Sequence, residues 1–460
     1  MAPHFSYSKT YCFEYVSSVC RAHCSWQNIN MNSDATGFLI ICSAMVLFMT
    51  PGLAFFYGGL VRASSVVSMM MMSFGSIALV AVMWVIFGYA MSFGNAGQGS
   101  YVGIDGVFGI DLNQLFLGGA LQDATDHNNG FSLVFAGFQG TFAIITVALI
   151  SGAIADRAKF GSWMLFAGVW ATLVYFPVAS WIFNFQADAS GRVINGGWLV
   201  YRVGVLDFAG GTAVEIASGA SALALALVVG KRFGFSKGMH APHNVPLVLI
   251  GVGILWFGWF GFNAGSALAA NGTATLAFVN TLAAPVAGML TWSLYEKLKH
   301  GKATSVGAGS GAVAALVAIT PSCGFLTPVW SLVLGAIVGV ICAMAIELKF
   351  ILGFDDSLDV VGVHLVGGLV GTLYLGFFAN GAGLIYSDTF DQLGKQAIGA
   401  FTVLIYAFCL SYAIGWCIQK TIGLRITSTD ELAGVDLVVH GESAYSGHDP
   451  RWSWRLGARG

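Results

Sequence analysis

The amino-acid sequence predicts an all-α membrane protein with eleven transmembrane helices. Three observations support this class: 57% of the 460 residues are hydrophobic, only 9% are charged, and the mean hydropathy is +0.77. A soluble domain would carry about 25% charged residues. With a net charge of −2 and no basic stripe, the chain gives no sign of nucleic-acid binding. No cysteine or histidine spacing predicts a metal site.

Residues 1–30 are polar and aromatic. They lack the apolar core of about 7–15 residues that a signal peptide has, so we interpret them as an extracellular N-terminal tail. Met31 begins a stretch typical of the start of a membrane protein, which makes Met31 a candidate for the true initiator.

The eleven predicted spans are apolar and, as helices, long enough to cross a hydrocarbon layer of about 30 Å. They are residues 36–60, 65–93, 131–155, 160–184, 207–230, 244–265, 274–296, 303–320, 327–350, 358–379 and 394–420. They form a membrane domain over 31–422, followed by a polar C-terminal tail over 423–460. The spacing of Gly307 with Gly311, and of Gly367 with Gly371, predicts close helix crossings.

Basic residues predict how the chain is oriented. Lysine and arginine mark cytoplasmic loops, and they concentrate in alternate loops of this sequence. These residues are Arg62, Arg157, Lys159, Lys231, Arg232, Lys237, Lys297, Lys299, Lys302, Lys349 and Lys420. The opposite loops carry only Arg192, Arg202 and Lys395. We therefore expect a multi-pass protein of the plasma membrane with its N-terminus outside and its C-terminus in the cytoplasm.

Beyond their acidic flanks, the fifth and tenth spans each carry one ionisable residue, Glu215 and His364. At about 1.5 Å per residue, Glu215 lies roughly 12 Å beyond Asp207, and His364 roughly 12 Å beyond Asp356. If the two helices enter from opposite faces, both side chains reach the middle of the bilayer. A lone carboxylate there costs about 2.5–3.5 kcal/mol on insertion scales. Each residue either only holds the packing or forms a functional site, and we favour the functional interpretation.

This placement predicts an inverted repeat. Spans one to five would oppose spans six to ten, and the eleventh helix would be additional. Repeats of this kind carry their site near the bilayer midplane, where the two halves meet.

Aromatic residues cluster near the outer ends of three spans. They are Phe138 and Phe142 in the third span, Trp181 and Phe183 in the fourth, and Phe262 in the sixth, one turn before Ser266. Aromatic belts at the membrane interface are routine anchors. The alternative is a cation site, since an ammonium-type ion over a ring face gains about 0.5–2 kcal/mol.

Several motifs, in this order, resemble the ammonium transporter family, Amt/Mep/Rh. They are FMTPGLAFFYGGLVR, FQGTFAIITVALISGAIADR, LDFAGGTAVEIASGA, WFGWFGFNAGSAL, DDSLDVVGVHLVGGLVGTL and HGESAY. The resemblance runs from about residue 36 to about residue 445. It implies a homotrimer that moves ammonium across the membrane, with a narrow central pore in each subunit. No cofactor and no enzymatic activity are expected.

The resemblance also implies roles for the aromatic clusters. An outer recruitment site would consist of Phe142, Ser266 and the aromatic residue of the fourth span. Beneath it, Phe138 or Phe142 would form a gate with Phe262. Asp207 would be the structural carboxylate that organises this site from just behind it.

Two departures from the family pattern matter. His364 matches the second member of the mid-pore histidine pair, but the first member is Glu215, as in fungal members. In the fourth span, the usual His-x-x-Trp reads Ser-Trp-Ile-Phe over residues 180–183. The site aromatic then falls on Phe183 by spacing, with Trp181 as the rival assignment.

Glu215 and His364 suit the chemistry of ammonium because a dry pore that passes neutral ammonia rejects potassium by its solvation cost. The proton left behind must return or cross separately, and a Glu215–His364 pair would titrate as one coupled unit.

Three further interpretations are open at this stage. The tail either packs across the cytoplasmic face and cooperates with PII-type signalling proteins, as in the family, or it is a solvated terminus. The chain is alternatively an ammonium sensor, which a fused cytoplasmic domain would favour. It is less consistent with an intramembrane acid–base enzyme, since Glu215 and His364 have no HExxH-like motif or nucleophile beside them.

Overall fold

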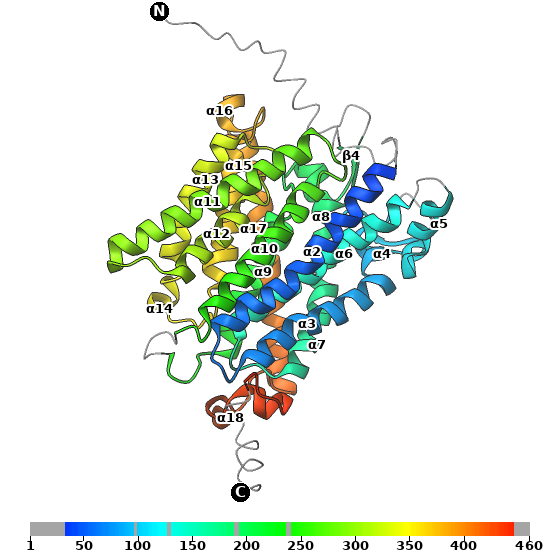
Figure 1. The fold of residues 1–460 in the computed structure, drawn as a ribbon. Helices are drawn as coiled ribbons and strands as arrows, with labels where there is room; N and C mark the ends of the chain where they lie inside the picture. Colours follow the sequence, from blue (N-terminus) through cyan, green and yellow to red (C-terminus); the bar gives the residue numbers. More distant parts are fainter. Residues whose placement is uncertain (1–32, 96–98, 127–129, 188–192, 236–240, 446–460) are drawn as a thin grey trace, which may run out of the picture.

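The computed structural model describes residues 33–95, 99–126, 130–187, 193–235 and 241–445. The proposed initiator Met31, the N-terminal tail over 1–30 and the chain end at 446–460 lie outside the described residues. Within the described ranges, ten helices are long and apolar enough to cross a membrane, and an eleventh apolar helix is shorter. The predicted all-α membrane class is confirmed (Figure 1).

Each of the eleven predicted spans corresponds to a helix or to a run of consecutive helical segments. In chain order they are α2 (Ser33–Leu60); α3, η1 and α4 (Val66–Met83, Trp84–Gly88, Tyr89–Ser92); α6 and η3 (Phe131–Ile150, Ser151–Ile154); α7, η4 and α8 (Phe160–Trp170, Ala171–Tyr175, Phe176–Phe183); η6 and α9 (Gly211–Ile216, Ala217–Val229); α10 (Val245–Gly265); α11 (Gly272–His300); α12 (Ser305–Ile319); α13 and α14 (Pro328–Ala345, Leu348–Leu352); η8 and α15 (Val361–Leu365, Val366–Phe378); and α17 (Asp391–Thr421).

The connections contain short elements. These are β1 (Tyr101–Ile104), β2 (Phe108–Asp111), η2 (Leu112–Leu117), α5 (Gly118–Asp126), β3 (Phe185–Ala187), β4 (Val193–Gly196), η5 (Leu199–Val203), α16 (Leu384–Ser387), α18 (Ser428–Ala433) and η9 (Asp436–His440). Strands β1 and β2 form one antiparallel hairpin, and β3 and β4 form another. We call the end of the bundle with these strands the hairpin end, and the opposite end, with α18, the tail end (Figure 1).

Capping side chains explain where several helices begin. Asn244 accepts a hydrogen bond from the Leu247 N–H at 3.0 Å, and Thr304 accepts one from the Gly307 N–H at 2.9 Å. Asparagine and threonine are preferred at this position because they satisfy an N–H that has no partner within the helix. The fifth span begins at Gly211 rather than at 207, because Asp207 caps the helix from outside it.

The two halves of the chain meet through equivalent helices. Helix α2, the first span, packs against α10, the sixth. A Cβ added to Gly52 would lie 3.2 Å from the Leu255 nitrogen, and one added to Gly251 would lie 2.3 Å from the Phe56 nitrogen. The fifth and tenth spans run antiparallel, since Arg232 after α9 binds Asp355 before η8.

A local pattern recurs in the fifth and tenth spans, as an inverted repeat requires. Each has an aspartate, a residue with positive φ three positions later, the ionisable residue eight positions after the aspartate, and a glycine four further on. The two series are Asp207, Gly210 (φ 115°), Glu215 and Gly219, and Asp356, Asp359 (φ 63°), His364 and Gly368.

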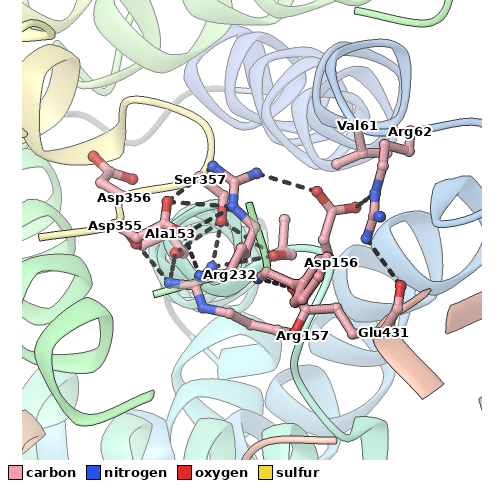
Figure 2. A network of polar contacts seen from close by, with 12 residues as sticks. Val61, Arg62, Ala153, Asp156, Arg157, Arg232, Asp355, Asp356, Ser357 and Glu431 are labelled. Atoms are coloured by element: carbon pink, nitrogen blue, oxygen red, sulfur yellow. Dashed lines mark hydrogen bonds and ion pairs between the residues drawn. The ribbon is translucent and has the colours of Figure 1, made fainter. Parts of the chain in front are cut away.

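A polar network joins the predicted cytoplasmic loops at the tail end (Figure 2). Arg232 binds Asp355 at 2.8 Å and Asp156 at 3.1 Å. Arg157 is fully buried and donates to the carbonyl oxygens of Gly230, Ala153, Ala155 and Asp355. The basic loops therefore lie together at one end, as their alternation predicts.

Candidate functional site

The ionisable residues Glu215 and His364, of the fifth and tenth spans, meet in the centre of the bundle. Nδ1 of His364 lies 2.7 Å from Oε2 of Glu215. The side chains are only 3% and 1% exposed. Each residue belongs to a π-helical segment, η8 for His364 and η6 for Glu215. Such segments are rare and are frequent at functional sites.

Glycine allows this contact, because the two helices cross at very short range. A Cβ on Gly219 would lie 2.3 Å from the Leu365 nitrogen, and a Cβ on Gly368 would lie 3.0 Å from the Cβ of Glu215. The glycine pairs predicted from the sequence, Gly307 with Gly311 and Gly367 with Gly371, also lie at close crossings, but with helices α11 and α12. A Cβ on Gly311 would lie 2.7 Å from the Gly288 oxygen in α11, and one on Gly371 would lie 2.1 Å from the Ala318 oxygen in α12.

Glu215 and His364 face a narrow cavity. The other residues that line it are Met49, Leu53, Phe56, Ile145, Leu149, Val214, Leu255, Trp259, Phe262 and Val313. Apart from the ionisable pair, this lining is apolar. The space open to the centre of a water-sized sphere is about 10 Å³. A cavity needs about that much to hold one water molecule, so this cavity admits only a very small molecule.

Two stacked phenyl rings lie beside this cavity. The rings of Phe142 and Phe262 are 4.0 Å apart between centroids and inclined by 16°. Phe138 packs edge-on against Phe142 at 4.8 Å. Of the two residues that the sequence left open as partners of Phe262, Phe142 therefore makes the stacked contact, and Phe138 supports it from behind.

The two aromatic candidates of the fourth span lie in different surroundings. Phe183 faces Phe142, with ring centroids 6.2 Å apart. Trp181 instead donates its indole N–H to the Val107 oxygen and packs against Tyr406 of α17. Phe183 is thus beside the stacked rings, whereas the Trp181 ring is held by other elements.

Ser266 and Asp207 complete the set of candidate residues. The Ser266 hydroxyl donates to the Phe262 oxygen at 2.9 Å, so its own lone pairs can still accept a hydrogen bond. The Asp207 carboxylate accepts from four backbone N–H groups, those of residues 210–213, at 2.7 to 3.2 Å. Asp207 therefore holds the start of the fifth span in place.

Comparison with known proteins identifies the family. The family model described as the Ammonium Transporter Family matches residues 37–445. The chain belongs to the ammonium transporter family. An ammonium transporter of Mycobacterium tuberculosis is 50% identical over 432 residues, which cover 89% of this chain and 90% of that protein.

Solved structures of the ammonium transporter family share the fold. The crystal structure of Saccharomyces cerevisiae Mep2 has a TM-score of 0.76 at 32% identity, covering 87% of this chain and 92% of that one. A structure called Sensor Amt Protein has a TM-score of 0.80 at 28% identity, covering 90% of this chain and all of that one.

Two residues that adjoin the cavity of this family member were missed from the sequence. Trp259 lines the cavity and donates to the Thr320 hydroxyl at 2.8 Å. Its spacing of three residues from Phe262 was the available signal, because residues so spaced share a helix face. Tyr57 donates its hydroxyl to the oxygen of Leu149, a lining residue, at 3.0 Å. Nothing in the local sequence distinguishes Tyr57 from an interface aromatic.

Proposed function

We propose that this protein transports ammonium across the plasma membrane. The observation that carries the proposal is the buried Glu215–His364 pair, which faces a narrow apolar cavity behind stacked phenyl rings. A cavity of this width and polarity excludes a hydrated ion and suits neutral ammonia. The paired carboxylate and imidazole supply the titratable groups that the remaining proton needs.

Ammonium would bind first at the hairpin end, between Phe142, Phe183 and Ser266. The rings offer their faces to the cation, and Ser266 accepts one hydrogen bond from it. Asp207 positions this region through its four N–H contacts. The stacked Phe142 and Phe262 rings, backed by Phe138, would form the gate. Ammonium loses a proton there, and ammonia enters the cavity.

The hairpin end would face outside, and the tail end would lie in the cytoplasm. The concentration of lysine and arginine in the tail-end loops supports this orientation. The tail over 423–445 contacts these loops: the Asp436 carboxylate accepts the N–H groups of Val67 and Ser68 at 3.0 and 2.7 Å. A PII-type regulatory protein is the partner we propose for this face.

A reconstitution assay tests the proposal. Purified protein in liposomes should speed the pH change that follows an ammonium pulse, relative to protein-free liposomes. The likeness to a structure called a sensor makes an ammonium sensor the second candidate. A sensor would bind ammonium without raising flux, so binding with a flux equal to that of protein-free liposomes would refute transport.

Removing the Ser266 hydroxyl should weaken ammonium binding. A hydrogen bond to a charged group is worth about 1.5–3 kcal/mol, so Ser266→Ala should raise the apparent KM about tenfold or more with little change in the maximal rate. Ser76→Ala is the matched control, because the buried Ser76 also donates to the carbonyl four residues earlier, in α3, a helix that contributes no candidate residue to the site. Flux measured against ammonium concentration checks this.

The aromatic residues can be separated in the same way. Phe183→Ala should raise the apparent KM by several-fold, since a ring contact with a cation is worth about 0.5–2 kcal/mol. Trp181→Phe replaces the indole with a smaller ring and removes the N–H that binds the Val107 oxygen, and it should leave the KM unchanged. A raised KM in Trp181→Phe with an unchanged KM in Phe183→Ala would instead assign the site to Trp181.

The protein should assemble as a homotrimer with one pore in each subunit. The Glu215–His364 contact and the cavity are formed within a single chain, so each subunit would carry a complete path. Native mass spectrometry from mild detergent should give the mass of three chains. A spectrum with only monomers or dimers would contradict the expected assembly.

A further inference from the structure

Three aspartates precede the tenth span, and their carboxylates are bound in three different ways. Asp355 binds Arg232 through both oxygens. Asp359 forms an ion pair with Lys349. Asp356 accepts the Val361 N–H through Oδ2 at 2.7 Å, but its Oδ1 has no hydrogen-bond partner among the described residues. Figure 2 shows the Asp356 carboxylate pointing away from the arginine network.

This free oxygen is unusual because Asp356 is only 1% exposed. Its counterpart in the inverted repeat is Asp207, which lies eight residues before Glu215, as Asp356 lies eight residues before His364. Both oxygens of Asp207 accept hydrogen bonds, from four N–H groups in total. A helix cap alone needs no more than the Oδ2 contact. The second oxygen of Asp356 is therefore available to bind a proton.

The surroundings of Asp356 keep its carboxyl within reach of neutral pH. Burial raises the pKa of Asp356 to about 6, Lys349 opposes this, and the charge of Asp359 adds to it. The Lys349 Nζ donates to the Asp356 main-chain oxygen at 2.9 Å and is itself paired with Asp359. Asp355 differs. Burial raises its pKa, but the hydrogen bonds from Arg232 and the charges of Arg157 and Arg232 outweigh burial, so the pKa of Asp355 is lowered.

Tyr57 of α2 lies near both Asp356 and Glu215. Its hydroxyl donates to the Leu149 oxygen at 3.0 Å. A Cβ on Gly152 would lie 2.6 Å from Cζ of Tyr57 and 2.8 Å from a methyl group of Val360, so the Tyr57 ring lies against the start of the tenth span. The charged and titratable groups described near Asp356 are Tyr57, Lys349 and Asp359, together with Asp355 and its partners Arg157 and Arg232.

We propose that Asp356 is a proton-exchanging residue at the tail end of the pore, so that the rate of ammonium transport depends on the pH at that face. The inference rests on the proposed transport function. Ammonium gives up its proton at the hairpin end, the Glu215–His364 pair takes up that proton, and ammonia crosses. The Asp356 carboxylate accepts the proton from the pair at the tail end and releases it to water, where ammonia takes up a proton again. Once protonated, Asp356 cannot accept the next proton.

Right-side-out membrane vesicles from expressing cells provide the test. The outer pH is held constant, the inner pH is set by the loading buffer, and an ammonium electrode follows the initial loss of ammonium from the medium. The ionised fraction of a carboxyl that titrates near 6 falls about tenfold between pH 8 and pH 5. Parental uptake, corrected for vesicles without the protein, should fall by about the same factor.

Asp356→Asn should make uptake insensitive to inner pH. Asparagine keeps an oxygen for the Val361 N–H, as does serine, but neither can ionise at that oxygen. At every inner pH, uptake by Asp356→Asn should stay at the low rate that the parent shows at inner pH 5. If Asp356→Asn assembles poorly, Asp356→Ser replaces it. Asp359→Asn is the matched control: it removes a carboxylate three residues away but leaves Asp356 able to ionise. Because the charge of Asp359 raises the pKa of Asp356, uptake by this variant should still depend on inner pH, with its profile shifted to lower pH.

The outcomes separate this inference from the function on which it rests. A parental profile in Asp356→Asn or Asp356→Ser would overturn the role of Asp356, and so would a flat profile in the parent or in Asp359→Asn. If the parent takes up no ammonium at any inner pH, the transport function itself is wrong.

Discussion

Glu215→Leu should lose ammonium transport by about a hundredfold or more, the scale on which a positioned proton-transfer group contributes. The change removes the carboxylate 2.7 Å from His364 and leaves that imidazole buried without its partner. Insertion should remain normal, because the substitution removes an ionisable carboxyl group from a membrane span. Flux in liposomes, compared at equal protein and equal oligomer yield, measures the effect.

Two further variants at this position distinguish a proton carrier from a packing residue. Glu215→Gln can still hydrogen-bond to His364 but cannot ionise, so it should lose transport nearly as far as Glu215→Leu. Glu215→His should keep transport with a shifted pH profile, because two imidazoles have no neutral ion-pair state. If Glu215→Leu or Glu215→Gln carries ammonium at the parental rate with an unaltered profile, Glu215 only fills space.

Asp207→Ala should cause the second large loss, in stability as well as transport. Its carboxylate accepts four backbone N–H groups at the start of the fifth span. A buried N–H left without an acceptor costs about 1–3 kcal/mol. We expect little assembled protein and a lower midpoint of thermal unfolding in detergent. Disorder at this helix start would also displace Glu215, so the remaining protein should transport poorly.

Asp207→Asn keeps one of the two accepting oxygens and should give an intermediate yield and stability. Asp391→Ala is the control for removing an aspartate near the same end, because its side chain is 67% exposed and forms only a surface pair with Lys395. Exposed pairs contribute about 0–1 kcal/mol. An Asp207→Ala protein with parental yield, midpoint and flux would show that the four contacts have no structural importance.

Much of the architecture follows from one-dimensional properties of the chain. A hydrocarbon layer requires apolar helices of about 20 residues, and each predicted span is a helix in the structure. The short α12 was also found, because its composition remains apolar up to the turn at residue 320. Helix arithmetic placed Glu215 level with His364, and the two residues meet there.

The sequence did not predict the short hairpins or the π-helical segments. The β-strands are three or four residues long, too short for a repeating pattern. A π-helical segment adds one residue to a turn without changing composition. The close approaches of Gly219 to Leu365 and of Gly368 to Glu215 were also missed, because many glycines precede or follow these positions and only the packing selects two of them.

By itself, then, the sequence determined the class, the number and order of the spans, the family and the meeting of Glu215 with His364, since all of these depend on composition and regular helical spacing. Tertiary structure decided which side chains act together. It put Phe142 rather than Phe138 on Phe262, and turned Phe183 toward them. It also left Asp356, alone among the three aspartates, with a buried carboxylate oxygen that has no hydrogen-bond partner among the described residues. These outcomes depend on contacts such as Arg232 with Asp355, between segments far apart in the chain, which local spacing does not encode.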